Sequence, residues 1–242
     1  MQRIFIDQHQ LKESSILLSK ESYHHLINVC RLRERSQLDV VIDGKRLLNI
    51  TITEVLADGI AYKINDQWSL SSSRPFKISL IQSLPKQDKL TDICRMCTEI
   101  GVSTFYPVIS EYCDVKELSD NKFRRIQTAI DSAAKQSKQS SIPTLQQPQS
   151  LATCLANIAF TPTTLALVAY ENATQGPSAA IKELTFDHLV LAIGPEGGFG
   201  ANDLTLFESS GFVPFSLGGF ILRTEHAGFA AINQLDGCLS KI

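Results

Sequence analysis

The sequence predicts an α/β protein in two parts, a small N-terminal β-barrel followed by a larger domain with a mostly parallel sheet. The first 70 residues contain short β-segments and two Asp-Gly turns, a pattern typical of small antiparallel barrels. A serine-rich stretch then ends at Pro75, and strands alternate with helices after it. We therefore expect one domain over residues 1–72 and another over residues 75–242.

In the first domain, alternating apolar and polar positions indicate half-buried strands, and one longer apolar pattern indicates a helix. The expected elements are the helix Glu21–Leu32 and the strands Gln37–Ile42, Leu47–Val55 and Ile60–Ile64.

In the second domain, apolar runs of strand length are separated by helical patterns, two of which end at a glycine. The expected strands are Phe76–Gln82, Thr104–Ile109, Thr164–Ala169, Asp187–Ile193 and Pro214–Leu217. The expected helices are Lys89–Ile100, Asn121–Gln139, Leu204–Ser210 and Thr224–Leu239.

Composition narrows the class of protein. Apolar residues make up 43% of the 242 residues, and no run reaches the ~20 apolar residues of a membrane-spanning helix. The first residues do not resemble a secretory leader, so we expect a cytoplasmic protein without a membrane partner.

The six cysteines are scattered. Cys94 and Cys97 lack a second ligand pair, which indicates two small buried helix residues and no metal site. The net charge of −2 does not exclude RNA, because binding needs only a local basic patch.

The segment Gly194-Pro-Glu-Gly-Gly-Phe-Gly200 follows an apolar strand and precedes a helix. Glycine lets a ligand approach the backbone closely, and open α/β sheets bind ligands at the carboxyl ends of strands. A tight turn that needs its glycines explains the pattern equally well. The segment is not a dinucleotide fingerprint and lacks the Lys-Ser/Thr of a P-loop.

A second glycine loop, Leu217-Gly-Gly-Phe-Ile-Leu-Arg-Thr-Glu-His-Ala227, also joins a short strand to a helix, so the two loops can converge on one pocket. Thr224 is suited to cap the helix, and Glu225 in the first turn suits the helix dipole. Arg223 has two acidic candidates as partner, Glu225 and Glu196.

Together the two loops resemble the knotted SPOUT methyltransferases, and within them the family that methylates N3 of a uridine in small-subunit ribosomal RNA. Weaker motifs agree in order along nearly the whole chain. They are Arg3 and Phe5, His25-Leu-Ile-Asn-Val-Cys-Arg31, Asp43-Gly44, Gln82-Ser-Leu-Pro-Lys86, Thr98-Glu-Ile-Gly-Val102, Pro107, Gln136-Ser137 and Pro143.

The resemblance implies a PUA-like N-terminal barrel, a C-terminal domain with a deep trefoil knot, and a homodimer. It implies that S-adenosyl-L-methionine binds in the knot, held mostly by backbone groups. The residues expected to bind this cofactor are Gly194, Pro195, Glu196, Gly197 and Gly198 in one loop, and Leu217, Gly218, Ile221, Leu222 and Thr224 in the other.

The implied partner is 16S ribosomal RNA or the small ribosomal subunit. Uracil N3 must lose a proton, so the site needs a base or a group that stabilises the anion. We expect Arg223 to stabilise this anion or to position the RNA, with Glu196 and Glu225 as bases or as groups that orient Arg223. Arg3, His25 and Arg31 are the expected RNA contacts, although without the resemblance a solvated surface would explain these residues.

The sequence departs from the family pattern at Met96, Lys135, Gln139, Gly200 and His226. Two alternatives therefore stand beside uridine N3 methylation. One is a knotted RNA methyltransferase with another target, and the other is a non-catalytic RNA-binding or ribosome-assembly protein of the same fold.

Overall fold

The computed structural model describes residues 2–71, 74–181 and 185–239, and the chain divides into two compact units. The first unit holds residues 1–73 together with residues 134–142, and the second holds residues 74–133 and 143–242. The sequence pattern places residues 134–142 in the second domain, whereas their contacts group them with the first. Residues 72 and 73 of the predicted break, and the predicted domain ends 1 and 242, lie outside the described residues.

The first unit is a five-stranded mixed sheet with the strand order β1-β3-β4-β5-β2. The strands are β1 Gln2–Ile6, β2 Ser15–Leu17, β3 Gln37–Ile42, β4 Arg46–Val55 and β5 Gly59–Ser69. The expectation of purely antiparallel pairing is wrong at one strand, because β1 runs parallel to β3. At the predicted turn, Asp43 and Gly44 both have positive φ, 49° and 67°, as tight hairpin turns require.

The predicted helix of this unit is shorter than expected and changes form along its length. It begins as the α-helix α1 Lys20–Tyr23 and continues as the π-helix η2 His24–Val29. A short 3₁₀ helix, η1 Gln8–Gln10, lies earlier in the chain. Residue Arg31, which the prediction placed inside the helix, has φ of +56°. A left-handed backbone cannot continue a right-handed helix, so the segment ends before this residue.

The second unit is a parallel sheet with the strand order β12-β10-β11-β6-β7-β8, with β9 also paired to β7. Its strands are β6 Lys77–Ser83, β7 Thr104–Ile109, β8 Thr144–Leu145, β9 Gln149–Ser150, β10 Thr164–Ala169, β11 His188–Ile193 and β12 Val213–Phe215. Its helices are α2 Lys89–Glu99, α3 Asp120–Gln136, α4 Leu151–Asn157, α5 Pro177–Ala180, α6 Ala201–Ser209 and α7 Thr224–Leu239. The last three residues of α3, 134–136, group with the first unit. Every element predicted in this unit is present, with ends within a few residues of the predicted ones. The short elements β8, β9, α4 and α5 were not predicted.

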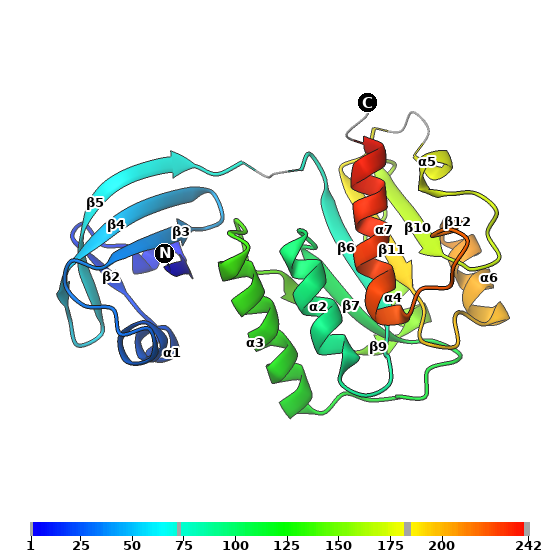
Figure 1. Cartoon of the computed structure of the whole chain (residues 1–242), viewed down its shortest axis with the longest axis horizontal. Coiled ribbons are helices and arrows are strands. Elements are labelled where there is room, and N and C mark those ends of the chain that lie inside the picture. Colours follow the sequence, from blue (N-terminus) through cyan, green and yellow to red (C-terminus); the bar gives the residue numbers. More distant parts are fainter. Residues whose placement is uncertain (1, 72–73, 182–184, 240–242) are drawn as a thin grey trace. The chain divides into compact units, whose positions relative to one another are not determined.

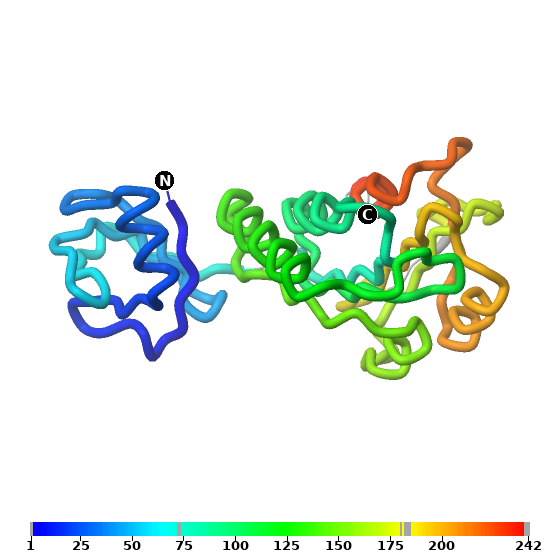
Figure 2. Tube along the Cα trace, turned by 90° about the horizontal axis from the view of Figure 1, so that it is seen from below, coloured from blue at the N-terminus to red at the C-terminus, as the bar shows by residue number. Residues whose placement is uncertain are grey.

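Helices cover both faces of this sheet, with α2 and α7 on one side and α4 and α6 on the other (Figures 1 and 2). Strand β11 is buried from Leu189 to Ile193, as expected of a central strand covered on both faces. The loops that leave the carboxyl ends of β10, β11 and β12 therefore meet at one edge. Within the described residues, no helix is long and apolar enough to cross a membrane.

Candidate active site

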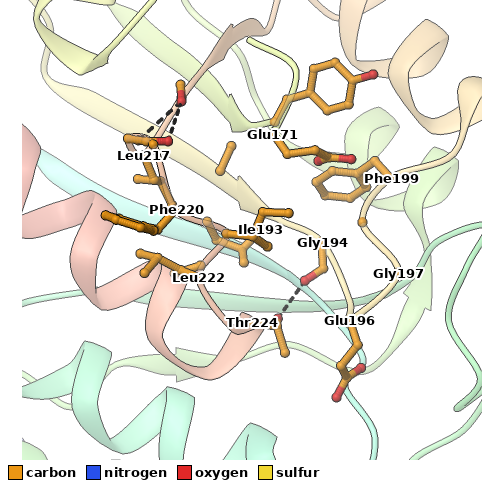
Figure 3. Close-up of a pocket in the computed structure, with 18 residues that line it drawn as sticks. Glu171, Ile193, Gly194, Glu196, Gly197, Phe199, Leu217, Phe220, Leu222 and Thr224 are labelled. Atoms are coloured by element: carbon orange, nitrogen blue, oxygen red, sulfur yellow. Dashed lines mark hydrogen bonds between the residues drawn. The ribbon is translucent and has the colours of Figure 1, made fainter. Parts of the chain in front are cut away.

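A cavity of about 290 Å³ lies where the two glycine loops meet at the carboxyl ends of β10, β11 and β12 (Figure 3). It is lined by Ala169, Tyr170, Glu171, Ile193, Gly194, Glu196, Gly197, Gly198, Phe199, Ser216, Leu217, Gly218, Gly219, Phe220, Ile221, Leu222, Thr224 and Ala227. Every residue predicted to bind the cofactor lines this cavity except Pro195. The prediction that the two glycine loops converge on one pocket is therefore confirmed.

The two walls of the pocket are joined through Thr224. Its hydroxyl donates to the carbonyl of Gly194 at 2.6 Å, and accepts from the side-chain amide of Gln82 at 3.0 Å. This bond replaces the helix-capping role that the sequence suggested for Thr224. The hydrogen bond to Gly194 holds the first turn of α7 against the loop that follows β11.

The first wall depends on backbone that only glycine adopts without strain. Gly198 has φ of +72°, and a Cβ placed there would lie 3.3 Å from a carboxylate oxygen of Glu171. A Cβ at Gly194 would lie 3.1 Å from the backbone of Gly198. The loop therefore folds closely back on itself, which leaves its backbone exposed to the cavity.

Sequence reasoning missed the third wall, formed by Tyr170 and Glu171 directly after β10. The signal was present, because ligands bind at the carboxyl ends of parallel strands and β10 is one of them. In Figure 3 the carboxylate of Glu171 is drawn next to Phe199, and both residues line the pocket. Its carboxylate has no hydrogen bond or ion pair to any residue that the structure describes.

A charged cluster connects the two glycine loops to α2. Lys89, the first residue of α2, places Nζ 2.8 Å from Oε1 of Glu196 and 3.4 Å from Oε2 of Glu225. Glu196 also accepts from the backbone amide of Lys86 at 3.2 Å and 3.3 Å. Arg223 is 4.0 Å from Oε1 of Glu225. The structure brings the three predicted catalytic residues together, and adds Lys89, which the sequence did not single out.

These contacts change the pKa values of the Glu196 and Glu225 carboxyls. Burial by itself would raise the pKa of Glu196, but the hydrogen bonds from Lys89 and from backbone amides outweigh it and lower that pKa. The pKa of Glu225 is lowered by its own backbone amide and by Lys89. The pKa of Lys89 is raised, chiefly by its hydrogen bond to Glu196. Both carboxylates are therefore weaker bases than an ordinary glutamate.

The residues predicted to contact RNA fall into two groups. His25 and Arg31 are exposed at the surface of the first unit. Arg3 is buried, forms an ion pair with Asp39 at 3.5 Å, and donates to the carbonyl of Lys138 at 2.6 Å. Its guanidinium is occupied within the fold, so its placement indicates a structural role in holding residues 134–142 against the sheet.

Cys94 and Cys97 are both buried inside α2, which confirms that this pair is part of the helix packing. Burial raises the pKa of Cys97 to about 12 and that of Cys94 well above its usual value. Neither thiol is activated as a nucleophile or redox group.

A family model for the RNA methyltransferase domain matches residues 72–236, which contain both glycine loops and the whole cavity. Ribosomal RNA small subunit methyltransferase E of Synechocystis sp. is 30% identical over 98% of this chain and 78% of that relative. This chain belongs to the RNA methyltransferase family. The methyltransferase of the same name from Bacillus subtilis is 27% identical over 97% of this chain and 96% of its own length.

The structural comparison agrees with this membership. The crystal structure of ribosomal RNA small subunit methyltransferase E from Neisseria gonorrhoeae, bound to S-adenosyl methionine, has a TM-score of 0.84 and 25% identity. The similarity covers 98% of this methyltransferase and 97% of that chain. The SPOUT resemblance and its knotted α/β fold are thereby confirmed. The departures from the family pattern, Met96, Lys135, Gln139, Gly200 and His226, do not line the cavity.

Proposed function

We propose that this methyltransferase transfers the methyl group of S-adenosyl-L-methionine to N3 of a uridine in 16S ribosomal RNA. One observation carries the proposal. The cavity lies between the two loops whose sequence resembles the uridine N3 methyltransferases, at the carboxyl edge of the knotted sheet. The names of the relatives support small-subunit ribosomal RNA as the substrate, and the resemblance supports uridine N3 as the atom.

The pocket suits this cofactor in size and in chemistry. Its volume of about 290 Å³ lies near the lower end of the ~300–1,000 Å³ usual for ligand sites. Ile193, Leu217 and Leu222 offer apolar surface to a nucleobase, and Glu171 offers an unpaired carboxylate to ammonium or hydroxyl donors. Among the described residues, the backbone amides of residues 219–222 make no hydrogen bond, so donors for a ligand's oxygen and nitrogen atoms are also present.

The bound cofactor supplies an activated methyl group, and the chain mainly supplies orientation and charge. Arg223 is 81% exposed and lies in the chain between Leu222 and Thr224, which both line the pocket. In our proposal its cation favours a uracil that has lost the N3 proton. The lowered pKa values of Glu196 and Glu225 make both carboxylates poor bases, so in our proposal the N3 proton passes to solvent water and neither carboxylate accepts it. Uracil N3 lies on the base-pairing edge, so the target nucleotide must be unpaired or flipped out.

We place RNA anchoring at the exposed His25 and Arg31 of the first unit, whose surface can recognise RNA by shape and phosphate contacts. Arg3 is not part of this proposed surface, because its side chain is buried and paired. The proposal includes a cytoplasmic location, where the ribosomal RNA is found, and a homodimer.

The experiment supplies purified protein and labelled S-adenosyl-L-methionine to small-subunit particles and to naked ribosomal RNA, both from a strain that lacks this protein. The RNA is then digested to nucleosides. Labelled 3-methyluridine is the expected product. A different labelled nucleoside would move the target while keeping the reaction, and no product with cofactor binding intact would favour the non-catalytic alternative.

The variant Arg223→Ala is expected to bind cofactor normally but to lose turnover by about 100-fold, the usual effect of removing one group that stabilises developing charge. Arg46→Ala, at a partly exposed hairpin position of the first unit, is the matched loss of an arginine outside the site. Turnover of Arg223→Ala near that of wild type would remove Arg223 from the mechanism.

A further inference from the structure

Lys89 occupies an unusual position, because it reaches both walls of the pocket from a third element. Its Nζ lies 2.8 Å from Glu196 in the first glycine loop and 3.4 Å from Glu225 at the start of α7. One ammonium therefore faces two carboxylates from segments about thirty residues apart in the chain. Neither carboxylate has another side-chain cation as close among the described residues.

Arg223 stands on the far side of Glu225 and is held only loosely. Its NH1 is 4.0 Å from Glu225 Oε1, and its side chain is 81% exposed, whereas that of Glu225 is 15% exposed. An ion pair at this distance in water contributes little. The more buried carboxylate thus faces Lys89, while the guanidinium remains in solvent beside the pocket.

Removing Lys89 would take away the cation that lies nearest to both carboxylates. Glu225 would be left as a largely buried carboxylate whose compensating cation is gone, and an unpaired buried charge is strongly unfavourable. Arg223 lies within reach, because it precedes Glu225 by two residues and already approaches the other carboxylate oxygen. The guanidinium would then be drawn onto Glu225 and away from the mouth of the pocket.

We propose that Lys89 is a positioning residue for methyl transfer, which neutralises Glu196 and Glu225 and thereby leaves Arg223 free to reach the RNA. The inference rests on the proposed function, since it assigns Arg223 its task on the RNA substrate. It goes beyond that function by predicting that the loss of Lys89 acts through Glu225.

The kinetic test compares wild type with Lys89→Met, Lys89→Arg, Glu225→Gln and the double variant Lys89→Met with Glu225→Gln. Lys89→Met is expected to lower kcat/KM for RNA by at least about tenfold, with KM for the cofactor little changed, since misplaced catalytic groups reduce the rate of the chemical step. The double variant is expected to recover most of this loss, because no carboxylate remains to capture Arg223. Lys89→Arg is expected to stay near wild type.

A second readout does not depend on activity. The Nε–H signal of Arg223 in ¹⁵N-detected spectra, assigned by its loss in Arg223→Lys, reports whether the guanidinium is held. It is expected to exchange fast with water in wild type, to become protected in Lys89→Met, and to be fast again in the double variant. Should Lys89→Met fail to fold, as judged by circular dichroism, Lys89→Gln serves in its place.

These outcomes separate the inference from the function on which it rests. If wild type transfers no methyl to RNA, the proposed function fails, and the Arg223 signal still tests the ion-pair exchange. If wild type is active but the double variant is no better than Lys89→Met, the inference is overturned. An Arg223 signal that is the same in wild type and Lys89→Met overturns it as well.

Discussion

Single polar groups decide how the walls of the pocket meet. The Thr224 hydroxyl bridges the Gly194 carbonyl and the buried side chain of Gln82, although the three residues belong to three different elements. Gln82 Oε1 has no hydrogen-bond partner in the described part of the chain. The junction therefore contains little redundancy, and the loss of one hydroxyl leaves buried groups unsatisfied.

Thr224→Val keeps the shape of this side chain and removes only its hydroxyl. We expect it to lower the free energy of unfolding by about 1–3 kcal/mol, the usual cost of leaving buried polar groups unpaired, and to weaken cofactor binding. Chemical denaturation and calorimetric titration measure the two effects. Thr224→Ser retains the hydroxyl and is the control, so equal losses in both variants would show that the hydrogen bonds are not the cause.

The lowered pKa values of Glu196 and Glu225 have a pH-dependent consequence. A carboxyl whose pKa is lower in the folded protein stabilises the fold above its ordinary value of 4.5, and this contribution is lost as pH falls through the lowered value. Wild type is therefore expected to lose thermal stability in acid more steeply than a variant with Glu196→Gln and Glu225→Gln. Melting curves from about pH 7 to about pH 3 test this over the range where carboxylates protonate. Parallel curves would contradict the assignment.

The helix α7, whose first residues line the pocket, packs closely against α2. The buried Gly228 of α7 faces Cys97 of α2 and Leu80 of β6. A Cβ placed at this glycine would lie 3.4 Å from the Cys97 sulfur and 3.5 Å from a Leu80 methyl. One methyl group therefore fits, whereas a larger side chain does not. The small, unreactive cysteines of α2 serve this packing.

Substitutions at Gly228 should separate helix propensity from packing. Gly228→Ala is expected to be neutral or stabilising by up to about 1 kcal/mol, because alanine favours helix. Gly228→Leu is expected to destabilise by about 1–3 kcal/mol through overpacking. Gly237 lies on the same helix with nothing within 4 Å of its added Cβ, so Gly237→Leu is the control in urea unfolding. Equal stability of the two leucine variants would show that α2 and α7 can separate freely.

At the scale of the whole molecule, the second glycine loop presents apolar surface that a single chain does not cover. Phe220 is 89% exposed and Ile221 is 88% exposed, and Leu222, the next residue of the loop, is 36% exposed. Exposed apolar groups gathered in one place are typical of protein interfaces. They support our proposal that two copies of the chain associate through this region.

Sedimentation equilibrium is expected to show a dimer for wild type and a monomer for Phe220→Glu with Ile221→Glu, because two charges in an apolar interface are unfavourable. Val213→Glu, which also places a charge at an exposed apolar position but outside the loop, is the control. A wild-type monomer at all concentrations would remove the dimer from the proposal, while an unaffected dimer in the double variant would move the interface elsewhere.

Much of this protein follows from local sequence. Strands β6, β7, β10 and β11 and helices α2 and α7 lie within a residue or so of their predicted bounds, because the apolar periods and the glycine stops are local signals. Both glycine loops were identified from their spacing and the resemblance, and their convergence followed from the rule that parallel strands end at one edge.

Contacts between distant segments had no local signal, and only the tertiary structure revealed them. No pattern around Lys89 indicates that its ammonium meets Glu196 and Glu225, more than one hundred residues away. Likewise, Arg3 resembles a surface arginine in sequence, yet it is buried against Asp39 and the Lys138 carbonyl. Periodicity records which face of an element is apolar, whereas the partner of a charge depends on how the elements pack. The sequence therefore decided the elements and the cofactor loops, and the fold decided which charges face one another around them.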